Sequence, residues 1–224
     1  MKYSILLIVA LFSFSAHAKD THLFLGFGEI PVLSSSFKPS IGVGKSFGSF
    51  ELGAYYQTSD SLERGSESFN TEFGQNGLSS SNESVGQRAM IQAKYYPWKE
   101  YFYVSAGVIF NDNDVEDMKF SSQSRQIGNN TYNTNLNVKL TRPQAFRPGI
   151  GIGFVFPITK SIKFSTDFTM DWFTGVPNPE VEVNSSQALS EVDKSVLVQQ
   201  VKDNFKSNFH NRHHLFNMGI SYHF

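Results

Sequence analysis

Apolar and polar residues alternate along several segments of the chain. In the segment 161–173, one face would carry Ile162, Phe164, Thr166, Phe168, Met170 and Trp172, and the other Ser161, Lys163, Ser165, Asp167, Thr169 and Asp171. The segments 101–110 and 147–156 alternate in the same way. Successive side chains of a strand point to opposite faces, so each segment predicts a strand with one apolar face. Strands of about ten residues cross the hydrocarbon layer of a membrane when they are tilted.

Turn signals divide the chain into eight predicted strands, joined alternately by short and long links. An even number of antiparallel strands closes into a barrel without free edges, as lipid requires. We therefore predict an all-β fold: an eight-stranded antiparallel transmembrane β-barrel with both termini in the periplasm. The first strand has an alternative, a plug or a periplasmic lead-in. The strands are expected at 22–30, 36–47, 49–58, 86–97, 101–111, 144–157, 161–173 and 212–224, and the polar loops at 59–85, 112–143 and 174–211.

One helix is expected in the last long loop, between about residues 186 and 206. Ser185 or Ser186 can cap it, and Glu191 and Asp193 lie near its start, where negative charge is favoured. A helix folded over the barrel mouth would bury two apolar patches, one on the barrel and one on another loop; a helix on the membrane surface is the alternative. The patches are Ala188, Leu189, Val192 and Val196, and Leu197, Val198, Val201 and Phe205.

The N-terminus has the layout of a secretory signal peptide. Lys2 precedes an apolar run at 5–14, and small residues lead up to Ala18. The run is too short to span a bilayer as a helix. We expect residues 1–18 to be cleaved and 19–224 to form one barrel domain in the outer membrane of a Gram-negative bacterium.

Composition narrows the class of protein further. The chain has no cysteine, so disulfides and thiolate chemistry are excluded, and its net charge of −1 disfavours nucleic-acid binding. A soluble periplasmic β protein is the alternative to a membrane barrel. The aromatic residues favour the barrel, because they gather near strand ends, where interfacial girdles form. The expected girdle residues are Tyr95, Tyr96, Trp98, Tyr101 and Tyr103 around one turn, and Trp172 and Phe173 at a far strand end.

The polar face of each strand would point into the lumen. Alternation predicts six charged lumen-lining candidates of both signs, which would suit passage of a small zwitterion such as an amino acid. The alternative is a salt-bridged plug that closes the barrel, since side chains fill an eight-stranded interior. The candidates are Glu51, Arg88, Lys94, Lys163, Asp167 and Asp171.

The last strand keeps its alternation to the final residue. Such a strand can pair with the first and close the barrel. The pattern also resembles the C-terminal signature by which the barrel assembly machinery recognises outer-membrane proteins. The residues of this assembly signal are Phe216, Met218, Ile220, Tyr222 and Phe224.

Residues 86–224 resemble the CarO type of small outer-membrane barrel. The resemblance rests on AGVIFNDNDVED, RPGIGIGFVFPITKSIKF and FTGVPNPEVEV, followed by a long polar segment and an aromatic last strand. It implies a role in passage of small solutes, basic amino acids among them, and in antibiotic susceptibility. We expect a monomer in contact with outer-membrane lipid and lipopolysaccharide. A closed barrel whose outer loops bind a partner, or that supports the envelope, is the alternative function.

Catalysis is not expected. The chain has neither a His-x-Ser-Asn run of the kind lipid A deacylases carry nor a G-x-S-x-G elbow. His210, His213 and His214 cluster, but their spacing matches no standard metal site. The acidic run at 111–117 lacks the glycine and distal glutamate of a calcium loop. We therefore predict no enzyme activity, no cofactor and no metal.

Overall fold

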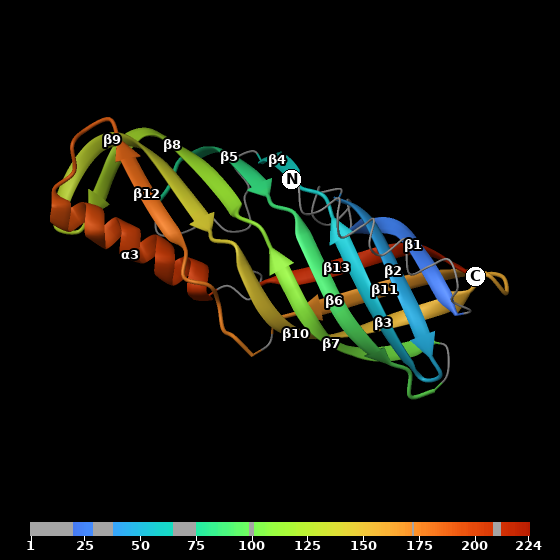
Figure 1. Cartoon of the computed structure of the whole chain (residues 1–224). Coiled ribbons are helices and arrows are strands. Elements are labelled where there is room, and N and C mark those ends of the chain that lie inside the picture. Colours follow the sequence, from blue (N-terminus) through green and yellow to red (C-terminus); the bar gives the residue numbers. More distant parts are fainter. Residues whose placement is uncertain (1–19, 29–37, 65–74, 99–100, 172, 208–211) are drawn as a thin grey trace, which may run out of the picture.

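The strands of the chain form a closed barrel and a second sheet beyond one end of it (Figure 1). The computed structural model describes residues 20–28, 38–64, 75–98, 101–171, 173–207 and 212–224. The predicted signal peptide, residues 1–18, lies outside them. The barrel strands are β1 (Thr21–Gly28), β2 (Lys38–Phe47), β3 (Phe50–Gln57), β6 (Arg88–Tyr95), β7 (Phe102–Asn111), β10 (Ala145–Pro157), β11 (Ile162–Met170) and β13 (His214–His223).

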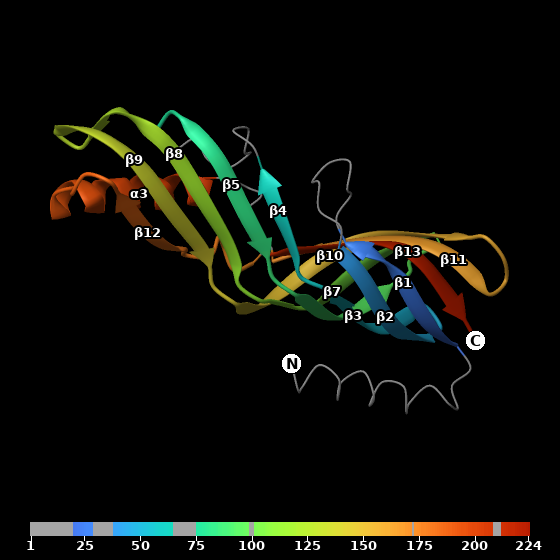
Figure 2. The same cartoon turned by 90° about the horizontal axis from the view of Figure 1, so that it is seen from above.

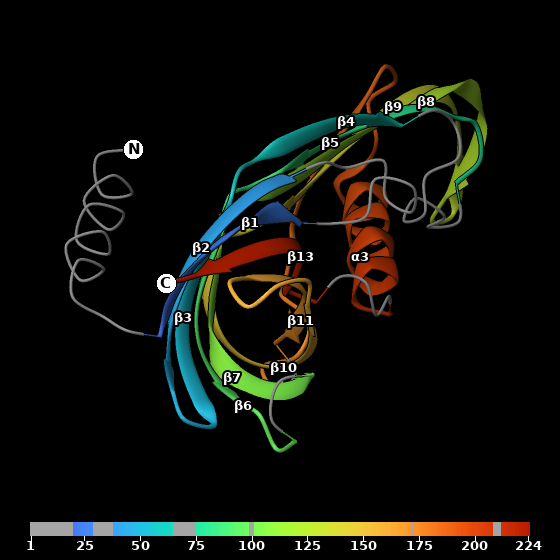
Figure 3. The same cartoon turned by 90° about the vertical axis from the view of Figure 1, so that its right-hand side faces the viewer.

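The barrel strands are all antiparallel, in the order β1-β13-β11-β10-β7-β6-β3-β2, and β2 pairs with β1 to close the ring (Figure 3). The prediction of an eight-stranded antiparallel barrel is therefore confirmed. The predicted segment 22–30, for which a plug was the alternative, supplies barrel strand β1, which pairs with both β13 and β2. Short turns and the C-terminus lie at one end, which we call the short-turn end.

Alternation along the strands sorts side chains between the barrel's two faces. On β10, Ile150, Ile152, Phe154 and Phe156 are exposed on the outside, whereas Val155 is buried. Glycine makes room for large interior side chains: a Cβ on Gly153 would lie 2.2 Å from Cζ of Tyr103, and one on Gly42 would lie 2.4 Å from Cδ1 of Tyr55. The barrel thus has an apolar exterior and an interior filled by side chains.

The outer sheet continues the barrel strands rather than consisting of loops. Its strands are β4 (Asp60–Arg64), β5 (Leu78–Val85), β8 (Asp114–Ile127), β9 (Asn130–Arg142) and β12 (Glu180–Ser185). Two-residue breaks separate β3 from β4, β5 from β6, β7 from β8 and β9 from β10. The outer order, β12-β9-β8-β5-β4, therefore repeats the order β11-β10-β7-β6-β3 of the barrel. The prediction of loops at 59–85 and 112–143 is wrong for most of their described residues, because polar strands extend beyond the barrel there.

Helix α3 (Glu191–Ser207) lies along the outer sheet and packs on β8 and β12 (Figure 2). Leu197, Val201 and Phe205 of the helix are buried in a second apolar core. The expected helix is confirmed. Its patch of Leu197, Val201 and Phe205 packs on the outer sheet and not on the barrel. Val192, from the other expected patch, is 73% exposed. The sheet contributes Met118, Phe120, Ile127, Tyr132, Leu136, Val138, Leu140 and Val183 to the core. We call β4, β5, β8, β9, β12 and α3 the outer module.

No helix in the described part of the chain is both long and apolar enough to cross a membrane.

The helix begins later than predicted because the two expected caps are used elsewhere. Ser185 ends β12, opposite Leu136, and the Ser186 hydroxyl lies 3.0 Å from that of Thr134. Ser190 is the cap instead: its Oγ accepts a 3.1 Å hydrogen bond from the Asp193 amide. A serine hydroxyl that binds an amide three residues on satisfies one of the free donors of the first turn.

The expected aromatic girdle is correct for some residues only. Tyr95, Trp98, Tyr101 and Phe173 are exposed large side chains at strand ends. Tyr103 is fully buried inside the barrel, so its assignment to the girdle is wrong; the next residue, Val104, is exposed on the other face of β7. The Tyr96 hydroxyl donates a 3.0 Å hydrogen bond to Glu51. Trp172 lies outside the described residues.

Candidate functional site: the barrel interior

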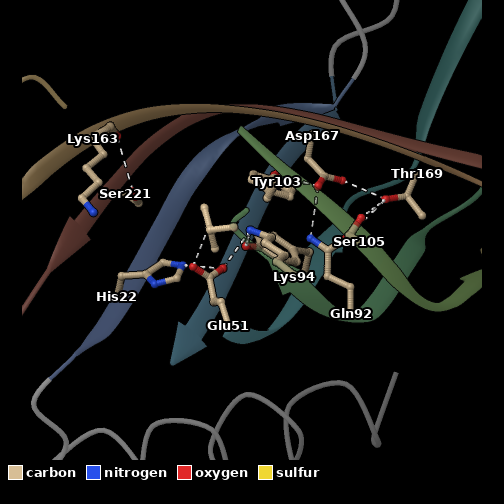
Figure 4. A network of polar contacts seen from close by, with 12 residues as sticks. His22, Glu51, Gln92, Lys94, Tyr103, Ser105, Lys163, Asp167, Thr169 and Ser221 are labelled. Carbon is tan, nitrogen blue, oxygen red and sulfur yellow. Dashed lines mark hydrogen bonds and ion pairs between the residues drawn. The ribbon is translucent and has the colours of Figure 1, made fainter. Parts of the chain in front are cut away.

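A buried ion pair occupies the interior near the short-turn end. Glu51 on β3 lies directly opposite Lys94 on β6, and Lys94 Nζ is 2.8 Å from Glu51 Oε1. His22 Nε2 lies 3.6 Å from the same carboxylate oxygen. These contacts are drawn in Figure 4. The pair satisfies both charges where water has little access, which is the condition for burying them.

The Lys94 ammonium also lies between two tyrosine rings. Its Nζ is 4.8 Å from the centre of the Tyr55 ring and 4.6 Å from that of Tyr103, and it donates a 2.5 Å hydrogen bond to the Tyr55 hydroxyl. Both rings are buried. Cation–π contacts of this kind gain strength when they are desolvated. The side chain of Lys94 is therefore held inside the barrel by groups from β3 and β7.

Asp167 on β11 anchors a second polar layer, one step further from the short turns (Figure 4). It accepts hydrogen bonds from Tyr103 Oη at 2.7 Å, from Thr169 Oγ1 at 3.1 Å and from Gln92 Nε2 at 3.2 Å. The donors come from three different strands, β7, β11 and β6. The layer therefore links β11 with β7 and β6, which are not its hydrogen-bonded neighbours in the barrel wall.

An apolar cluster lies next to these polar layers. Phe24, Tyr55, Met90, Ile109 and Leu215 pack together, and all five are buried. They come from β1, β3, β6, β7 and β13, so the cluster spans the barrel. Alongside it, Gln57 donates a 2.9 Å hydrogen bond to Asn217, which also accepts a 2.6 Å bond from Ser40. Side chains thus fill the interior at this level.

Charged residues gather where the barrel meets the outer module. Asp114 Oδ2 lies 3.5 Å from Arg88 and 3.1 Å from Arg142. Burial opposes ionisation of Asp114, but the two guanidinium groups outweigh it and hold the pKa of its carboxyl below the usual value. His213 is buried beside them; its burial and the charge of Arg142 lower the pKa of its imidazole to about 3, so it is neutral at neutral pH.

Asp171 and Lys163, the remaining candidates, lie at opposite ends of β11. Asp171 is buried beside the outer module, where its amide donates a hydrogen bond to the His213 carbonyl at 2.9 Å. Burial raises the pKa of the Asp171 carboxyl, although Thr174 donates a 3.3 Å hydrogen bond to it. Lys163 lies near the short turns and is partly exposed. The six candidates therefore belong to three separate places.

A cavity of about 540 Å³ lies at the short-turn end. Its lining includes Lys163, His22 and His223, and Tyr55 and Lys94 at its inner end. Beyond them lies the Asp167 layer; the apolar cluster reaches the cavity through Phe24 and Tyr55. Sequence reasoning placed Glu51, Lys94 and Lys163 on the interior face but missed His22 and His223. The alternation of inward and outward residues along β1 and β13 could have identified both histidines as interior residues.

The outward face of β13 carries the residues of the expected assembly signal. Ile220, Tyr222 and Phe224 are exposed, and Phe216 and Met218 are partly exposed on the same face. Recognition by the assembly machinery stays a prediction. No group of three or more histidine, cysteine or acidic side chains in the described ranges is arranged to hold a metal ion. His210 of the histidine cluster lies outside those ranges.

The barrel and outer module together match solved structures. A crystal structure of Acinetobacter baumannii CarO2 aligns with a TM-score of 0.58 at 16% identity, over 93% of this chain and 100% of that one. A crystal structure of A. baumannii CarO aligns with a TM-score of 0.55 at 11% identity, over 92% and 98%. The chain has the CarO fold. No protein-family model matches the sequence, and neither does any curated protein. At these identities the similarity extends to the fold and confirms the CarO-type architecture expected from the sequence.

Proposed function

We propose that the chain is an outer-membrane β-barrel that is closed to free diffusion and that acts through its outer module. The CarO fold and the apolar exterior of the barrel support the membrane location. Exposed apolar side chains such as Leu52 on β3, Ile91 on β6 and Val108 on β7 occur on successive barrel strands. Such a band suits the hydrocarbon layer, whereas a soluble barrel would leave it in water. The short-turn end would then face the periplasm and the outer module the cell exterior.

The filled interior is the observation that supports a closed barrel. The ion pair of Lys94, the Asp167 layer and the apolar cluster follow one another along the barrel axis. Each uses side chains from several strands, so side chains fill the interior at each of these levels. An eight-stranded barrel of ordinary shear has little room to spare. Function would therefore rest with the outer module, as a structural or surface-binding element.

Solute flux tests the closed state. The chain from residue 19 would be refolded into liposomes, and folding checked by the heat-dependent gel shift of intact barrels. Swelling with glycine, glutamate and arginine is expected to equal that of empty liposomes. Swelling ordered by solute charge would contradict the proposal and favour passage.

Restricted passage of small polar solutes is the second candidate function, supported by the cavity at the short-turn end. Charges of both signs line it, and its inner end is formed by the side chains of Lys94 and Tyr55. Removing the obstruction distinguishes the two functions. Under the closed-barrel proposal, Tyr103→Ala stays impermeable because the apolar cluster remains. Selective glycine flux in wild type, enlarged in Tyr103→Ala, would favour restricted passage.

A further inference from the structure

A row of breaks crosses four adjacent strands where the barrel meets the outer module. On the barrel side of the row, Arg88 pairs with Asn111. On the module side, Ser84 pairs with Val115. Figure 2 shows the outer sheet turning away from the barrel at this row. Local disruptions of a strand ladder, such as bulges, bend the strands. The breaks are residues 58–59, 86–87, 112–113 and 143–144.

Side-chain oxygens bind two of the backbone amides in this row. The Gly86 amide donates a 2.8 Å hydrogen bond to Asp114 Oδ1. The Gln144 amide donates a 2.6 Å hydrogen bond to Asn113 Oδ1. A backbone bond of 2.9 Å also joins two neighbouring breaks. In a regular ladder the amides bind carbonyl groups of the neighbouring strand. Contact between the breaks therefore depends in part on the side chains of Asn113 and Asp114.

Asp114 is also linked by charge to both sides of the row. Its Oδ2 lies 3.5 Å from Arg88 on barrel strand β6 and 3.1 Å from Arg142 at the end of β9. Arg88 donates a 3.0 Å hydrogen bond to the His214 carbonyl on β13. The Arg142 guanidinium lies 5.3 Å from the centre of the Phe205 ring on α3. One carboxylate thus connects the barrel wall with the sheet and the helix of the outer module.

The outer module is attached along one side of the barrel rim. The barrel is a closed ring, in which every strand pairs on both sides, whereas the outer sheet has two edges, β12 and β4. Within the described ranges, no strand of the outer sheet continues β13, β1 or β2. An open sheet attached in this way can change its angle to the barrel without unpairing any barrel strand.

We infer that the row of breaks is a bending line, and that Asn113 and Asp114 hold the outer module at one angle to the barrel. Without either side chain, the module takes up a range of angles over the barrel mouth. The barrel and the module themselves are retained, because each has its own strand ladder and its own apolar core. The inference concerns the junction, so it holds whether or not the barrel conducts.

Distances between spin labels test the bending line. The chain has no cysteine, so labels can be attached through Val108→Cys on β7 and Lys194→Cys on α3, at two exposed positions. Double electron–electron resonance is recorded on the chain from residue 19, refolded in detergent micelles. Asn113→Ala and Asp114→Ala should each broaden this distance distribution. A pair within the module, Lys119→Cys on β8 with Lys194→Cys, should keep its distribution.

Amide exchange tests the two acceptors directly. Asn113→Ala should speed exchange of the Gln144 amide about five- to tenfold, the effect of losing one hydrogen bond. Asp114→Ala should speed exchange of the Gly86 amide by more, because its acceptor is charged. Gel mobility before and after heating shows that each variant has folded. Asn113 is exposed, so its variant tests the inference even if loss of the buried Asp114 prevents folding.

Asp117→Ala on β8 and Asn133→Ala on β9 are the matched controls, since both residues belong to the outer module but lie away from the breaks. Both should keep the wild-type distribution. Unchanged distributions in Asn113→Ala and Asp114→Ala would overturn the bending line. A wild-type distribution as broad as theirs would overturn the holding role of the two side chains. Equal broadening of the pair within the module would also overturn the inference, because the module itself would then have loosened.

Discussion

Lys94 Nζ lies 2.8 Å from Glu51 Oε1, directly across the β3–β6 pair, and both side chains are buried. The same ammonium binds the Tyr55 hydroxyl and faces the ring of Tyr103. Tyr103 in turn donates to Asp167 on β11. One lysine thus connects the first polar layer to the second, and its removal should affect the whole interior.

Lys94→Met should lower the free energy of unfolding by about 3–5 kcal/mol, because Glu51 would remain buried without its main partner. Urea titration of the refolded barrel in lipid vesicles measures the loss. The double variant Glu51→Leu/Lys94→Met should recover most of it, since a buried pair replaced by apolar groups is often near neutral. The exposed Lys194→Met is the control. A loss in Lys94→Met no larger than in this control would contradict the interior placement of the pair.

Gly153→Ala should destabilise the barrel by about 1–3 kcal/mol, the usual effect of overpacking a filled interior. The added methyl would lie 2.2 Å from Cζ of Tyr103 and 2.5 Å from the Thr166 carbonyl oxygen. The same urea titration measures the effect. Adding Tyr103→Leu should make Gly153→Ala less costly, because it removes the ring that the methyl meets. Strict additivity of the two substitutions would show that they do not interact.

The sequence was sufficient for the barrel because alternation is a local signal. Phe154 and Val155 point to opposite faces whatever the rest of the chain does, so strand positions and their apolar faces follow from parity. Parity also placed Glu51 and Lys94 on the same side of their strands. Their pairing depends on the register between β3 and β6, which composition does not specify.

The outer module could not be predicted in the same way. Its strands carry polar residues on one face, and β5 has the sequence LSSSNESV, which is typical of a loop. The segment forms a strand because β8 lies alongside it: Leu78 pairs with Phe120, and the Ser81 hydroxyl donates a hydrogen bond to Glu116. The helix was visible from its apolar residues, but its partner surface, formed by residues such as Leu136, comes from a distant part of the chain.

Phe168→Lys tests whether the apolar exterior of the barrel faces lipid. Phe168 lies on the outward face of β11, between the inward Asp167 and Thr169. A cation near the middle of the bilayer should cost about 2–4 kcal/mol of folding free energy in vesicles. Phe173→Lys, beyond the end of β11, is the matched control and should cost at most about 1 kcal/mol. Equal, small costs at both positions would argue against a membrane-spanning β11.

Asp193 fastens α3 to the tip of the β8–β9 hairpin, and this contact should depend on pH. It is buried and accepts hydrogen bonds from Asn130 at 2.7 Å, Tyr132 at 2.5 Å and Ser190 at 2.8 Å. These bonds lower the pKa of the Asp193 carboxyl. A carboxyl group whose pKa is lower in the folded than in the unfolded chain contributes its full stabilisation above the unfolded-chain pKa, about 3.9. That contribution is lost as the pH falls through the folded-state pKa.

Amide-exchange protection of α3, normalised to intrinsic rates, should therefore be constant from neutral pH to about 4 and fall below it. Asp193→Asn should reduce protection already at neutral pH and flatten the acidic fall, because an amide does not titrate. Asp203→Asn, on an exposed part of the same helix, is the matched control and should keep the wild-type profile. An unchanged profile in Asp193→Asn would mean that burial of Leu197, Val201 and Phe205 holds the helix without the carboxylate.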